Sequence, residues 1–71
     1  MRVKIRLDTL KDAQRFAEIA ESCEGWVHIT DTNSMCVNGK SILGVLHAME
    51  FTDIWVESEK EIYERIKDFV I

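Results

Sequence analysis

The feature that most constrains the fold of this chain is the spacing of its apolar residues, which changes between period two and the helical period. From Arg2 to Leu7, apolar and basic residues alternate, so one face of the segment is apolar and the other is charged. A period-two pattern of aliphatic residues also occurs in residues 26–30, with Val27 and Ile29, and in residues 52–57, with Ile54 and Val56. Strands with a single apolar face are typical of antiparallel sheets that helices cover on one side only.

Between these segments, apolar residues recur at the spacing of an amphipathic helix. We expect a first helix that follows Asp8 and Thr9 and runs to about Ser22. Thr9 is its expected N-cap, and Asp12, three residues later, completes a capping box in which aspartate replaces the usual glutamate or glutamine. Gly25 lies just beyond the expected end of this helix and favours its termination.

Two further helices are expected. The second begins at Ser41, after the turn that Asn38 and Gly39 favour, and ends near His47 or Met49. The third is preceded by Ser58 as its cap and by an acidic first turn. The apolar stripe of the third helix is formed by Ile62, Ile66, Phe69 and Val70.

The order of these elements predicts the fold class. Residues 31–33 are expected to form a hairpin turn into a short strand at residues 34–37. The resulting order of strand, helix, strand, strand, helix, strand and helix predicts one α+β domain over residues 1–71, with helices on one side of a mostly antiparallel sheet. A ferredoxin-like domain is the alternative, since it needs the same first six elements without the last helix.

Composition excludes several classes of function. The net charge of −4 and the isoelectric point near 5.0 argue against nucleic acid as the main partner. No apolar run approaches the roughly 18 residues of a membrane span, so we expect a cytoplasmic protein that does not bind membranes. Cys23 and Cys36 are too isolated to predict a metal site or a disulfide, and no cofactor is expected.

The segment from Lys40 to Val45 reads K-S-I-L-G-V. It resembles the regulatory-serine motif of HPr, the small phosphocarrier of the bacterial sugar phosphotransferase system, which typically reads K-S-I-M-G-V. The resemblance implies an open-faced β-sandwich with strand order 1-4-2-3 and three helices on one face. It also implies that Ser41 is phosphorylated by the HPr kinase/phosphorylase. From the residues alone, the simpler explanation of Ser41 is that it is only a helix N-cap, since most serines at helix starts are caps.

The resemblance does not extend to the histidine that carries the phosphoryl group in HPr. Matching Phe16 and Ala20 to the first helix of that family places Thr9 at the histidine, whereas matching Leu10 places Lys11 there. A threonine hydroxyl forms a stable phosphate ester and a lysine is largely protonated, so neither residue supports a phosphorelay. His28 and His47 lie elsewhere, and we expect them to be structural.

The resemblance implies a regulatory, non-enzymatic protein. The family includes a paralogue that lacks the histidine, keeps the serine and acts as a co-repressor partner in catabolite control. Protein partners would then be a phosphotransferase-system enzyme, a kinase or a transcriptional regulator. The residues that match the docking surface of the family are Ile42, Leu43, Leu46 and His47.

A second hypothesis rests on the solvent face of the sheet. The strand pattern places Trp26, His28 and Trp55 on that face, with Arg2, Lys4 and Arg6 from the first strand. Tryptophan and arginine are favoured at interfaces, so this face is a candidate for self-association as a homodimer or for assembly, with Ser41 only a cap. The competing explanation is that the aliphatic stems of Arg6 and Lys4 cover the indoles within one monomer.

Overall fold

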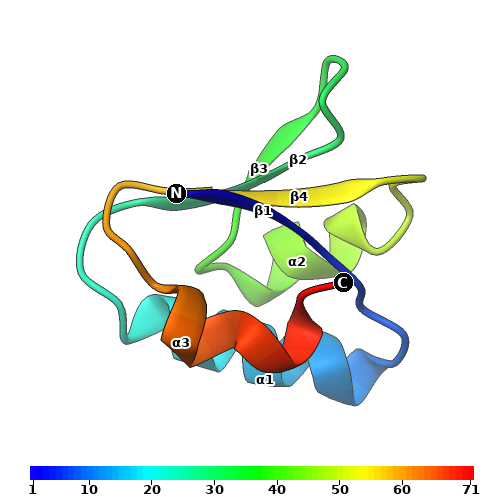
Figure 1. Ribbon diagram of the computed structural model, residues 1–71. Helices are drawn as coiled ribbons and strands as arrows, with labels where there is room; N and C mark the ends of the chain where they lie inside the picture. Colours follow the sequence, from blue (N-terminus) through cyan, green and yellow to red (C-terminus); the bar gives the residue numbers. More distant parts are fainter.

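A computed structural model describes residues 1–71 as a four-stranded antiparallel sheet with three helices packed on one face (Figure 1). The expected α+β class and the number of elements are therefore confirmed. The presence of the last helix separates the fold from the ferredoxin-like alternative. In chain order the elements are β1 (Arg2–Ile5), α1 (Leu10–Glu21), β2 (Val27–Thr30), β3 (Cys36–Asn38), α2 (Ile42–Ala48), β4 (Ile54–Ser58), α3 (Tyr63–Ile66) and a 3-10 turn, η1 (Lys67–Phe69).

The strand order is β1-β4-β2-β3, the order that the resemblance to HPr implied. The last strand of the chain, β4, lies inside the sheet between β1 and β2, so it joins the two halves of the chain. Its central residue Val56 faces Val3 of β1 on one side and Ile29 of β2 on the other. All three pairings are antiparallel.

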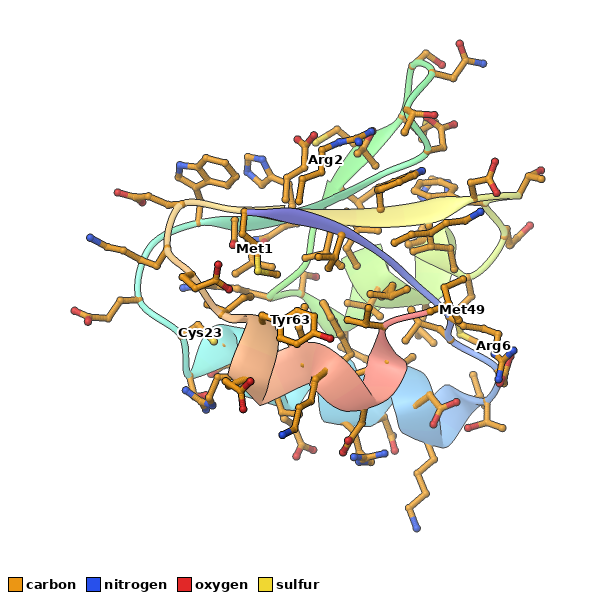
Figure 2. The ribbon with its side chains drawn as sticks, viewed as in Figure 1. Met1, Arg2, Arg6, Cys23, Met49 and Tyr63 are labelled. Carbon is orange, nitrogen blue, oxygen red and sulfur yellow. The ribbon has the colours of Figure 1, made fainter.

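The core lies between the sheet and the helices, as Figure 2 shows with side chains filling the space below the strands. The inward faces of the strands are those that the alternation predicted. On α1, three alanines alternate with Phe16 on the buried face, and small side chains there let the helix approach the sheet closely. Phe16 meets Phe69 edge to face, with ring centroids 5.5 Å apart. This contact joins α1 to the end of the chain.

The start of α1 forms the capping box that the sequence predicts. The side chain of Thr9 accepts the backbone N–H of Asp12 at 3.1 Å, and the Asp12 carboxylate accepts the N–H of Thr9 at 3.3 Å. The same carboxylate also accepts the N–H of Asp8 at 3.0 Å. Two of the four backbone N–H groups that a helix start leaves without partners are thus hydrogen-bonded to the side chains of Thr9 and Asp12.

The expectation that Ser58 caps the last helix is wrong. Strand β4 continues through Ser58, which is 4% exposed and donates its hydroxyl to the carbonyl of Lys60 at 2.5 Å. Glu59 N–H then donates to the Trp26 carbonyl at 3.0 Å, so pairing between the β2 and β4 segments extends one residue further. The helix α3 therefore begins later, at Tyr63, without a side-chain cap.

The third strand also begins later than the pattern suggests, because residues 31–35 form the turn. Asp31 N–H donates to the Met35 carbonyl, and the Asp31 carboxylate accepts the backbone N–H groups of Asn33 at 2.8 Å and Met35 at 3.1 Å. Thr32 has φ of +66°. These contacts form the tip of the β2–β3 hairpin, which projects beyond the sheet in Figure 1.

The hairpin tip predicts a pH effect at Asp31. The hydrogen bond from Asn33, followed by that from Met35, holds the pKa of the Asp31 carboxyl below its ordinary value. Because the pKa of Asp31 is lower in the folded protein than in the unfolded chain, the ionised carboxylate stabilises the folded state. This stabilisation is complete above the unfolded pKa of about 3.9 and is lost as pH falls through the folded value. We expect NMR titration of the Asp31 carboxyl to show the depressed pKa, and Asp31→Asn to remove this acid-dependent loss. An unshifted titration would contradict the hydrogen-bonding scheme.

Candidate functional site

Ser41 lies at the N-cap of α2, with extended backbone angles. Its side chain accepts the backbone N–H of Gly44 at 3.3 Å, a long hydrogen bond for a cap. The hydroxyl donates to no protein group, and the residue is half-buried rather than covered by a neighbour. Ser41 is therefore a helix cap whose hydroxyl is also partly accessible, so the two explanations of this serine are compatible.

The turn before Ser41 is held to the sheet by backbone contacts. Asn38, the last residue of β3, accepts the N–H of Lys40 with its side chain at 2.9 Å and the N–H of Ser41 with its carbonyl at 3.2 Å. Gly39 N–H donates to the Val27 carbonyl at 2.8 Å. The position of the serine is thus fixed relative to both β2 and β3, although it lies outside the strands.

Lys40 connects this turn to the end of α1. Its ammonium donates to the carbonyl of Cys23 at 2.7 Å, beside the carboxyl end of that helix, which has no basic residue in its last turn. A cation there satisfies a carbonyl and opposes the negative end of the helix dipole. The lysine of the motif therefore has a structural role that the sequence analysis did not anticipate, because the pairing spans 17 residues.

The four docking residues implied by the resemblance are not equivalent in the structure. Leu43 is 76% exposed and Ile42 is 39% exposed, directly after Ser41. His47 is exposed, with its ring 5.9 Å from that of Phe51. Leu46 instead packs against the core. The exposed surface at the start of α2 is therefore formed by Ile42 and Leu43, with His47 one turn later.

The two candidates for the position of the missing histidine lie at the other end of the sheet. Thr9 caps α1, and Lys11 is exposed in the first turn of that helix. Because β1 and β3 run in opposite directions, α1 and α2 start at opposite ends of the sheet (Figure 1). The structure does not bring Thr9 or Lys11 to Ser41.

The open face of the sheet separates the two tryptophans. Trp26 is 45% exposed and stacks on His28, with ring centroids 4.7 Å apart. Trp55 lies opposite Thr30, which is four residues further along the same segment than Trp26. The tryptophans therefore occupy different rows of the sheet and do not form a cross-strand pair.

A basic side chain covers one of the indoles, but it comes from a different residue than the sequence suggests. The guanidinium of Arg2 lies 4.2 Å from the centroid of the Trp55 ring and forms an ion pair with Glu57 at 3.0 Å. Arg6 pairs with Asp8 at 3.2 Å, beyond the end of the sheet (Figure 2). The register places Lys4 directly opposite Trp55 and Arg2 on the diagonal. Lys4 pairs with Asp53 instead, at 3.0 Å, and the indole is covered by Arg2.

No group of three or more histidine, cysteine, aspartate or glutamate side chains is arranged to hold a metal ion. None of the helices has the length and apolar composition that crossing a membrane requires. Comparisons with known protein families, with curated proteins and with solved structures found no significant match to this chain.

Gly44 provides a test of how closely α2 approaches β3. A Cβ at Gly44 would lie 2.5 Å from the carbonyl oxygen of Asn38. Helix propensity alone predicts that Gly44→Ala stabilises the protein by up to about 1 kcal/mol. We expect the clash with the backbone to reverse the sign, giving a loss of at least about 1 kcal/mol in urea unfolding. Leu43→Ala, at an exposed neighbour, is the control and should change stability little; a stabilised Gly44→Ala variant would contradict the close approach.

Proposed function

We propose that this chain is a non-enzymatic protein-interaction module whose docking surface is the start of α2 and whose switch is phosphorylation of Ser41. The observation that carries the proposal is the arrangement at the start of that helix. A partly exposed hydroxyl that donates to no protein group is followed directly by two exposed apolar residues, Ile42 and Leu43. A modification there would alter the surface that a partner contacts.

The chemistry of the helix start supports the serine as the acceptor. Transfer of a phosphoryl group to the Ser41 oxygen adds about −1.5 to −2 charges at pH 7. The new charge lies beside backbone N–H groups at the positive end of α2, where an anion is stabilised. The same charge lies close to Leu43. An apolar partner surface that fits the unmodified helix would then bind less well, because the phosphate would lose its water, whereas a basic surface would be attracted.

The absence of a convergent catalytic group supports a binding role over an autonomous enzyme. His28 stacks on an indole on the open sheet face, opposite Glu57, whose carboxylate pairs with Arg2. His47 lies on α2, and no nucleophilic side chain is hydrogen-bonded to either histidine ring. Thr9 is engaged as a helix cap. In keeping with the resemblance to HPr, the proposed partners are a phosphotransferase-system enzyme, a kinase or a transcriptional regulator in the cytoplasm.

The test is to incubate the protein with HPr kinase/phosphorylase and ATP, and separately with phosphoenolpyruvate and the first enzyme of the sugar system. We expect a single phosphate from the kinase alone, located at Ser41 by mass spectrometry and abolished by Ser41→Ala. Ser34→Ala, at the exposed hairpin tip, is the matched control and should be phosphorylated normally. Leu43→Ala should slow phosphorylation about tenfold, a loss of about 1.4 kcal/mol, without lowering the melting temperature.

Two outcomes would reject the switch. Phosphate that remains in Ser41→Ala would show that another residue is the acceptor. A folded protein that takes no phosphate from either enzyme would leave the fold intact and remove the proposed regulation.

The alternative function is assembly through the open sheet face, and the exposure of Trp26 beside His28 favours it. An exposed indole on a face that no helix covers is a typical interface anchor. If this function operates, the mass measured by sedimentation should rise to that of a dimer with concentration, and Trp26→Ala should return it to a monomer. Tyr63→Ala, an equally exposed aromatic on the helical side, is the control. A mass that stays monomeric at all concentrations would exclude the homodimer.

A further inference from the structure

Strand β3 forms one edge of the sheet and pairs only with β2. Directly after the strand, Gly39 N–H donates to the carbonyl of Val27 at 2.8 Å, on the side of β2. Backbone groups of successive strand residues point alternately to the two sides. Those of Val37 therefore also face β2, whereas those of Cys36 and Asn38 face outward.

Most of these outward groups have no partner within the chain. The carbonyl of Asn38 accepts the N–H of Ser41 at 3.2 Å, which uses one of them. The N–H of Asn38 and both backbone groups of Cys36 are left to solvent. Cys36 thus presents a donor and an acceptor on the same outer side, which is the pair of groups that opposite residues of two antiparallel strands exchange.

The two edges of the sheet differ in how they are protected against pairing with another chain. At β1, Ile71 N–H donates to the Lys4 carbonyl at 3.2 Å, so the chain end covers part of the outer side. Strand β1 also carries Arg2 and Lys4, whereas residues 34–38 contain no charged side chain and no proline. Charges, prolines and covering segments are the means by which sheets avoid edge-to-edge contact. Strand β3 is therefore the unprotected edge.

The side chains along this edge are complementary to a second copy of the same edge. Antiparallel pairing with Cys36 opposite Cys36 uses the free N–H and carbonyl of that residue reciprocally. Two-fold symmetry then sets Met35 of each copy opposite Val37 of the other. Met35 is 37% exposed and Val37 is half-buried at the margin of the core, so the pairing covers apolar surface in both copies.

The polar side chains and the occupied carbonyl favour the same register. Ser34 of one copy comes opposite Asn38 of the other, so no like charges meet across the contact. A register centred on Val37 would instead need the Asn38 carbonyl, which already accepts the N–H of Ser41. Figure 1 shows the β2–β3 hairpin pointing away from the helical layer, which leaves room beside the strand.

We propose that this protein dimerises through β3, with two copies paired antiparallel at their outer edges and Cys36 of each copy opposite Cys36 of the other. The contact joins the two sheets into one continuous sheet and is isologous, as two-fold dimers require. It differs from the open sheet face around Trp26, and it does not depend on phosphorylation of Ser41.

The first experiment places charges on the two-fold axis. Cys36 is exposed, so Cys36→Lys and Cys36→Glu leave the core untouched, and circular dichroism melting checks that both fold. Sedimentation equilibrium of the natural protein should show a mass that rises with concentration from monomer to dimer. Each variant alone sets like charges opposite one another and should dimerise at least about tenfold more weakly. An equimolar mixture of the two should recover the dimer, because lysine then lies opposite glutamate.

Cys36→Ser is the matched control and should dimerise as the natural protein does, since the backbone supplies the hydrogen bonds. Trp26→Ala should also leave this dimer unchanged, which separates it from association through the open face. A natural protein that stays monomeric at all concentrations would overturn the proposal. A mixture that associates no better than either charged variant alone would also overturn it.

The second experiment tests the register with oxidised glutathione. Opposite residues that exchange both hydrogen bonds have Cα atoms about 5.5 Å apart, within the range that a disulfide spans. Two Cys36 thiols should give up two protons and two electrons to form the disulfide, and oxidised glutathione should take these up to become two molecules of glutathione. We expect a covalent dimer whose linked peptides both contain Cys36, and none from Cys36→Ser. Glutathione bound to Cys36 without a covalent dimer would contradict the register.

Discussion

Burial of one face of the sheet beneath the three helices is the interaction on which the rest of the structure depends. The inward side chains of all three long strands and the small-residue face of α1 form one core, joined to the chain end by the contact between Phe16 and Phe69. A chain of 71 residues has room for one such layer only. The opposite face of the sheet therefore stays open and exposes Trp26, whereas Ser41 lies at the start of α2, in the helical layer.

The start of α2 is positioned by this core through backbone contacts. The turn from Asn38 to Ser41 is hydrogen-bonded to the ends of two strands, and Gly44 allows the helix to lie against the Asn38 carbonyl. Lys40 adds a link to the end of α1. Ser41 is therefore held in one position relative to the core by backbone contacts.

Local signals predicted the elements well where the responsible residues are close in sequence. The capping box of Thr9 and Asp12 involves residues three apart, and it occurs as expected. The same kind of signal failed at Ser58, where a plausible cap was outweighed by pairing between the end of β4 and the segment before β2. The candidate site also combines local and long-range causes. The helix start that contains Leu43 was predictable from neighbouring residues, whereas the partial burial of Leu46 depends on packing against the core.

The sequence by itself determined the class of the fold, the buried face of each strand and the helix start that contains Ser41, because each follows from the period and chemistry of neighbouring residues. Only the tertiary structure decided that Arg2 rather than Arg6 covers an indole, that the two tryptophans lie in different rows, and that the chain end pairs with the outer edge of β1. These features depend on cross-strand register and on backbone hydrogen bonds between residues far apart in the chain. Such contacts form when the sheet closes around β4, and no local pattern encodes them.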